Sequence, residues 1–297
     1  KAWDLSTRVS EITPAAQLLD LSGRFLALSE TNDDFLRDGS GTVERTLPDR
    51  SYNGVRQVAA QAGLLLEELN AMPRQQLSHE DALTATMLQR DLELLIEAPE
   101  HHWLYFDVTP YNGGYVMSAE LVPALNNIDL AAGDGVEHYL SLFNDAERFI
   151  NGLAAKLKLQ KQRGILLPKA AIPKIRETYF GLRDNLAALS RFDPSRLEGL
   201  SAERVQQLKE ESASALQDKL YPAVDLLLAA LGDDYLAEAP EAAGLYQYPG
   251  GEAYYNYLIR RETSLDLTPD QIHQMGLQAM AEIQQQMQAL RQQLGFT

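Results

Sequence analysis

Apolar side chains recur every three or four residues along most of this chain, which is the spacing of an amphipathic helix. In the stretch from Tyr52 to Met72, for example, Val55, Leu65 and Leu69 follow this spacing. The helices that the pattern predicts cover residues 15–28, 52–72, 78 onward, 134–163, 173–189, 201–231 and 269–294. The sequence therefore predicts a mainly α protein, built as a multi-helix array.

Capping residues mark where some of these helices begin. Ser78 followed by Asp81 resembles a capping box, and Thr268, Pro269 and Gln271 form a complete one. The last predicted helix is rich in glutamine, and we assign the glutamines to its wet face because its apolar residues keep to one side. Those apolar residues are Ile272, Ala279, Ile283, Met287, Leu290 and Leu294.

The helical pattern is interrupted between Glu100 and Met117, where the sequence reads EHHWLYFDVTPYNGGYVM. This segment is aromatic, β-branched in places and punctuated by Thr109-Pro110 and by Gly113-Gly114, which predicts a short strand or extended segment with a turn. We therefore expect a small β or extended insertion around residues 100–117. Residues 1–297 are otherwise expected to form a single helical lobe, with any sub-division near residues 165–172.

Composition narrows the class of protein. Asp and Glu number 42 against 26 Lys and Arg, so the formal net charge is −16, which repels the phosphates of nucleic acids. No apolar run approaches the roughly 20 residues of a membrane-spanning helix. The absence of cysteine excludes disulfides, thiolate metal sites and a cysteine nucleophile. Neither a nucleic-acid partner nor a membrane span is expected.

The chain begins with Lys1-Ala2-Trp3, without an initiator methionine or an apolar signal core. Removal of a leader and deliberate truncation both explain this start. We expect an exported protein, either periplasmic or anchored to the envelope as a lipoprotein, and the cytoplasm is the alternative.

The histidines do not form a zinc motif. A helical zinc site needs two histidines one turn apart, as in H-E-x-x-H. His79-Glu80 matches the start of this motif, but Leu83 occupies the position of its second histidine. His101 and His102 are adjacent, so their side chains point apart. We expect no metal site and no cofactor in this chain. The sequence also lacks a G-x-S-x-G nucleophile elbow and a phosphate-binding loop.

Two aromatic clusters are candidates for binding. The first comprises Tyr105, Asp107, Tyr111 and Tyr115 around Gly113-Gly114, because tyrosine offers a binding cleft both an apolar ring and a hydrogen-bond donor. A packed aromatic turn is the simpler interpretation of these residues.

The second cluster follows Pro249-Gly250-Gly251 and contains Tyr254, Tyr255, Arg260 and Arg261. A guanidinium group matches a carboxylate in a bidentate fashion, so these arginines are candidates for holding a carboxylate-bearing ligand. On spacing alone, pairing with nearby Glu252, Glu262 or Asp266 is the simpler alternative.

The same region carries a longer pattern, P-G-G-x-x-Y-Y-x-x-L-I-R followed by L-T-P-D-Q-I-H-x-x-G-L. It resembles the bacterial family called domain of unknown function 885. The matching residues are Gly250, Gly251, Tyr254, Tyr255, Leu258, Arg260, Leu267, Thr268, Pro269, Ile272, His273, Gly276 and Leu277. Two departures occur: Glu262-Thr263-Ser264 replaces the paired threonines common in the family, and residues 279–283 replace its Glu-Val-x-x-Ile.

The resemblance implies a longer, largely helical protein similar to zincin-type zinc metallopeptidases, with an H-E-x-x-P-G-H-H-like motif in its C-terminal half. This chain lacks that motif, so by resemblance it is the N-terminal half of a two-lobed, peptidase-like protein. Zinc, its ligands and the general base would then come from the C-terminal lobe. This lobe would form one wall of a peptide-binding cleft, with Tyr254, Tyr255, Arg260, Arg261, Tyr111 and Tyr115 as candidate contacts.

Two other functions are open. A non-catalytic helical binding or scaffold module of the cell envelope explains the missing ligands without a second lobe. A carbohydrate-active helical enzyme with paired carboxylates has only the aromatic clusters in its favour. The full open reading frame distinguishes the peptidase-like protein from the scaffold module, since only the peptidase-like protein continues into a His-Glu motif.

Overall fold

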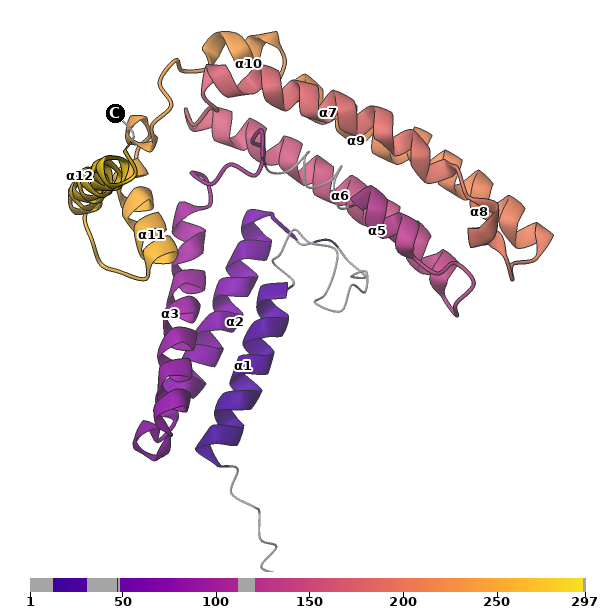
Figure 1. Ribbon diagram of the computed structural model, residues 1–297. Coiled ribbons are helices and arrows are strands. Elements are labelled where there is room, and N and C mark those ends of the chain that lie inside the picture. The colour runs from indigo at the N-terminus through magenta and orange to yellow at the C-terminus, as the bar shows by residue number, and fades with distance from the viewer. Residues whose placement is uncertain (1–12, 31–46, 48, 112–120, 296–297) are drawn as a thin grey trace, which may run out of the picture. The chain divides into compact units, whose positions relative to one another are not determined.

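The computed structural model describes residues 13–30, 47, 49–111 and 121–295, and it divides the chain into two compact units. The larger unit spans residues 1–243 and the smaller unit residues 244–297. Within the described ranges every regular element of secondary structure is a helix and none is a strand (Figure 1). The predicted all-α, multi-helix class is therefore confirmed. Residues 165–172 lie inside the larger unit.

The larger unit contains most of the helices. In chain order they are α1 (Pro14–Glu30), α2 (Tyr52–Ala71), α3 (His79–His101), α5 (Val122–Asn127), α6 (Gly135–Gln162), α7 (Ile172–Leu186), α8 (Ala202–Ala215), α9 (Tyr221–Ala230) and α10 (Asp233–Glu238). A π-helical turn at Leu216–Leu220 joins α8 to α9. Pro222 follows this turn and has no backbone N–H to donate, which explains the local change of hydrogen-bond register.

Helices α1, α2 and α3 lie side by side and enclose one apolar core (Figure 1). Its buried members are Leu18, Leu21, Leu28, Ala62, Leu65, Leu69, Met72, Ala85, Leu88 and Leu92. Ser78 caps α3 as predicted, since its hydroxyl oxygen accepts the backbone N–H of Asp81 at 3.1 Å. The 3.6-residue repeat of leucine and alanine is thus what holds the three helices together.

A second core of the larger unit surrounds α6, which packs against α8 and α9. Tyr139 on α6 contacts Phe143 edge to face at 5.4 Å, and its hydroxyl donates to the carbonyl oxygen of Leu189 at 2.5 Å. Two buried positions of α6 are polar, Lys156 and Gln160. Buried polar groups require partners, and both side chains find them in the segment that follows α3.

That segment is the one for which the sequence predicted a strand or an extended stretch. Helix α3 continues to His101, a turn follows, and residues 105–111 are irregular. No strand is found among residues 100–111. The side-chain amide of Gln160 donates to the carbonyl oxygens of Trp103 and Tyr105 at 2.8 and 3.2 Å and so holds this segment. Residues 112–117 lie outside the described residues.

The smaller unit contains a 3-10 turn at Leu245–Gln247, α11 (Gly251–Thr263) and α12 (Pro269–Gln293). Ser264 ends α11 in the left-handed conformation, with φ 56°. Thr268 begins α12 with the predicted capping box, in which its hydroxyl oxygen and the side chain of Gln271 each accept the other's backbone N–H.

Across the described helices, none combines the length and the apolar character that crossing a membrane requires. This agrees with the prediction made from the length of the apolar runs.

Candidate functional site

The start of α11 depends on the two glycines of the Pro-Gly-Gly motif. Gly250 precedes the helix with φ 78°, a conformation that costs an ordinary residue about 1–2 kcal/mol. A Cβ on Gly251 would lie 1.8 Å from the carbonyl oxygen of Leu245. The motif is therefore required by the backbone itself, which turns sharply from Leu245 into α11.

Helix α11 carries four of the residues predicted to bind a ligand, and they differ in accessibility. Tyr254 is buried and stacks on Tyr257, with ring centroids 6.1 Å apart. Tyr255 is 47% exposed and Arg260 is half-buried. Arg261 is exposed and its guanidinium lies 2.7 Å from the carboxylate of Glu262. The simpler alternative for Arg261, pairing with a nearby carboxylate, is thus confirmed.

These observations divide the α11 candidates by the role that each can take. Tyr255 is exposed and Arg260 is half-buried, whereas Tyr254 is buried and packs its ring on Tyr257. A phenol and a guanidinium on one helix suit a ligand with a carboxylate, such as a peptide. That Tyr255 and Arg260 bind such a ligand stays a prediction.

Helix α12 contains no buried residue along its 25 residues. Its large apolar side chains are exposed by about half or more: Met275 57%, Leu277 49%, Met280 59%, Ile283 55%, Met287 52%, Leu290 55% and Leu294 69%. Scattered apolar residues are normal on a protein surface, but a continuous stripe marks a face that packs against something.

The first aromatic cluster is only partly assembled in the structure. Asp107 accepts a hydrogen bond from Lys156 of α6, and the Lys156 ammonium lies 5.2 Å from the centroid of the Tyr105 ring. Tyr111 is 80% exposed, and its backbone N–H donates to the hydroxyl of Thr109 at 3.2 Å. Tyr115 lies outside the described residues. Asp107 and Tyr105 thus belong to a packed turn, as the simpler interpretation predicted.

The ion pair between Lys156 and Asp107 is buried, with side chains 8% and 9% exposed. Burial lowers the pKa of Lys156 because it penalises the charged ammonium, while the nearby carboxylate of Asp107 opposes that shift. Together with the two hydrogen bonds from Gln160, the pair fixes the segment after α3 onto α6. Its role on this geometry is to hold the fold.

A group of rings lies at the same end of α3. His102 is 5.4 Å from Tyr52 and 4.7 Å from Trp103, measured between ring centroids. Arg163, at the end of α6, covers the Trp103 ring at 3.9 Å. Burial, together with the positive charges of Lys156 and Arg163, lowers the pKa of His102 to about 3. His102 is therefore neutral at physiological pH.

The sequence pattern did not indicate that Lys156, Gln160 and Arg163 belong to this cluster. A signal was present, because Phe149, Leu153, Lys156 and Gln160 share one face of the predicted helix. Two polar residues on an apolar face require buried partners. The partners themselves could not be deduced from spacing.

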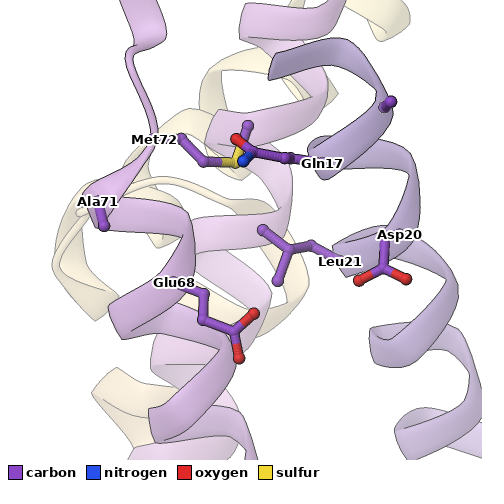
Figure 2. A pocket seen from close by; sticks show the side chains of 7 residues that line it. Gln17, Asp20, Leu21, Glu68, Ala71 and Met72 are labelled. Carbon is purple, nitrogen blue, oxygen red and sulfur yellow. The ribbon is translucent and has the colours of Figure 1, made fainter. Parts of the chain in front are cut away.

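A shallow groove lies between α1 and α2, with a volume of about 540 Å³ (Figure 2). Its lining residues are Ala16, Gln17, Asp20, Leu21, Glu68, Ala71 and Met72. The two carboxylates on its rim are paired, because Arg24 lies 2.7 Å from Glu68 and 3.3 Å from Asp20. This arrangement links two helices and leaves no convergent polar groups for chemistry.

The described residues contain no cluster of side chains that could hold a metal ion. No three of their histidine, aspartate and glutamate side chains converge on one point. His101 instead lies 3.1 Å from Glu97, one helical turn away. No catalytic step is therefore derived through a metal here.

The fold and these sites define a class of protein. It is all-α over the described residues, and a tyrosine-bearing helix that begins at Gly250-Gly251 is followed by a capped helix with an exposed apolar stripe. The sequence matches the family described as "Bacterial protein of unknown function (DUF885)" over residues 36–297, so the chain belongs to this family. The family assignment made from Gly250 to Leu277 is confirmed. No curated protein matches the chain in sequence.

One solved structure is similar over nearly the whole chain. It is described as the "putative lipoprotein from Colwellia psychrerythraea", and it shares 19% identity with a TM-score of 0.68. The match covers 96% of this chain and 52% of that protein, so this chain spans about half the length of its neighbour. At this identity the likeness establishes the fold alone.

Proposed function

We propose that this chain is a helical docking lobe of a longer, envelope-associated protein and that α12 is the face through which the lobe attaches to the rest. The observation that carries the proposal is the exposed apolar stripe of α12, where the helix has no buried residue. An amphipathic helix gains most of its stability from packing its apolar side, so this stripe favours a covered state.

Two comparisons support the larger protein and its location. The Colwellia protein has roughly as much polypeptide outside the matched region as inside it, since the match covers 52% of its chain. Its description as a "putative lipoprotein" favours attachment of this protein to the bacterial envelope. A periplasmic or lipid-anchored location is proposed on that basis.

The peptidase-like activity belongs to the same proposal. The resemblance to zincin-type metallopeptidases assigns zinc, its ligands and the general base to the other lobe. This lobe would supply one wall of a peptide-binding cleft. On α11, the exposed Tyr255 and the half-buried Arg260 are the candidate contacts of this wall.

The test compares the complete gene product with residues 1–297 alone, by zinc content and peptide hydrolysis. The proposal expects stoichiometric zinc and activity in the complete product only. In that product, Tyr255→Ala and Arg260→Ala should raise KM for a peptide more than they lower kcat, because both residues bind rather than react. Tyr246→Ala is the matched control, since Tyr246 is a 79% exposed tyrosine of the same unit.

Functional zinc in residues 1–297 alone would overturn the division of labour between the lobes. If the protein is instead a non-catalytic scaffold, the complete gene product should contain no zinc and hydrolyse no peptide, while α12 still binds another protein. The apolar, nearly uncharged face of α12 suits that alternative too, so the zinc measurement is the one that separates the two.

A further inference from the structure

One line of residues on α12, from Gly276 to Leu294, follows a stricter rule than a general amphipathic stripe, and Met275 and Leu277 lie off this line. Gly276, Met280, Ile283, Met287, Leu290 and Leu294 are separated alternately by four and three residues. An average period of 3.5 residues is typical of the contact line, or seam, of a coiled coil. Side chains along the seam insert between those of a single partner helix. A helix on a globular core carries a broader apolar face instead.

Residues beside this seam are nearly uncharged. Gln284, Gln286 and Gln293 flank it, and Arg291 is the one charged residue at a flanking position between Met280 and Leu294. Coiled coils that select separate partners commonly do so through charges at these positions. The α12 seam lacks that device, which favours a partner already held nearby over one that must be selected from solution.

Gly276 adds a feature at the N-terminal end of the seam. A Cβ at this position would meet no atom of the described residues within 4 Å, so none of these residues requires a glycine there. In the middle of a helix, glycine costs about 0.5–1 kcal/mol relative to alanine. At a seam position it leaves a notch that a large side chain of a facing helix can fill.

We infer that α12 pairs, in this four–three register, with one helix from the remainder of the same polypeptide. The inference rests on the proposed function and specifies the contact through which the lobe attaches. The occupant follows from two observations: the uncharged flanks, and a structural neighbour whose matched region accounts for 52% of its length. A second copy of this chain and the larger unit itself are the competing occupants.

The chain has no cysteine, which allows a direct accessibility test with single-cysteine variants. Met287→Cys lies on the seam, and Gln285→Cys lies on the opposite side of α12 as the matched control. Each is reacted with a maleimide, and labelling is followed on its own peptide by mass spectrometry. In the complete gene product Met287→Cys should react at least about ten-fold more slowly than Gln285→Cys. In residues 1–297 alone the two rates should be similar.

Each other labelling result overturns the inference in a recognisable way. Equal rates in the complete product mean that the seam is uncovered. Slow labelling in residues 1–297, with disulfide-linked dimers, identifies a second copy as the occupant. Slow labelling in monomeric residues 1–297 means that the larger unit covers the seam. Absence of zinc and hydrolysis with protection intact would refute the peptidase-like function alone and leave the pairing standing.

A stability measurement gives an independent readout. Leu290→Gln should leave the unfolding midpoint of residues 1–297 unchanged, because Leu290 is 55% exposed there. The same substitution should lower the midpoint of the complete product, where the side chain would be buried. Gln285→Leu is the control, and equal effects of Leu290→Gln on both proteins would contradict the pairing.

Discussion

The ammonium of Lys156 on α6 and the carboxylate of Asp107, beyond the end of α3, form an ion pair whose side chains are 8% and 9% exposed. Forty-nine residues separate the two in sequence. The pair joins the segment after α3 to the central helix of the second core, where Gln160 holds the same segment through two carbonyl oxygens.

Removing one partner of this pair should be costly. Asp107→Leu leaves the Lys156 ammonium buried without its carboxylate, and we expect a loss of about 3–5 kcal/mol in the free energy of unfolding. The double variant Asp107→Leu with Lys156→Met removes both charges and should recover most of that loss. Urea denaturation of the three proteins measures both values. Equal stabilities of the single and double variants would show that the buried charge is not the cause.

The neutral His102 predicts a dependence of stability on pH. Its folded pKa of about 3 lies below the ordinary value of 6.5, so the unfolded chain binds a proton that the folded chain does not. The free energy of unfolding should therefore fall as pH drops from about 6.5 towards 3.

His102→Phe retains a ring against Tyr52 and Trp103 and removes the titration. The free energy of unfolding should then depend less steeply on pH in this window, by an amount that corresponds to at most about one bound proton. Denaturation at several pH values measures this slope. An identical slope in both proteins would mean that His102 is already protonated in the fold.

The contact between Arg163 and Trp103 should make a small contribution. A guanidinium 3.9 Å from an indole centroid at a solvent-accessible site contributes about 0.5–1 kcal/mol, so Arg163→Gln should cost that amount. The emission of Trp103 should shift as well, because the charge next to the ring is lost. Arg191→Gln, at an exposed arginine, is the control and should change neither quantity.

Gly251 should be the less replaceable glycine of the Pro-Gly-Gly motif. Gly251→Ala places a methyl group 1.8 Å from the backbone of Leu245, so the turn into α11 must open. Gly250→Ala costs only the left-handed conformation, about 1–2 kcal/mol. Gly181→Ala, where a Cβ meets nothing, should stabilise α7 by about 0.5–1 kcal/mol. Hydrogen exchange of α11 distinguishes these effects, and equal protection in all three variants would contradict them.

The candidate site was predictable to the extent that it depends on neighbouring residues. The capping box of Thr268, the pairing of Arg261 with Glu262 and the turn at Gly250 each involve groups a few residues apart, so spacing was sufficient. The burial of Tyr254 and the exposure of Tyr255 were not predictable, because the burial of each residue depends on which other segments pack against its side of the helix.

By itself, the sequence determined the all-α class, the positions of most helices and the family, since helical periodicity and a motif of some thirty residues are local properties. Only the tertiary structure decided that Lys156 meets Asp107, that residues 105–111 form no strand, and that α12 is left with its seam exposed. These outcomes depend on contacts between distant segments. A repeat of apolar residues shows which side of a helix must be covered, whereas the identity of what covers it depends on the arrangement of the whole chain.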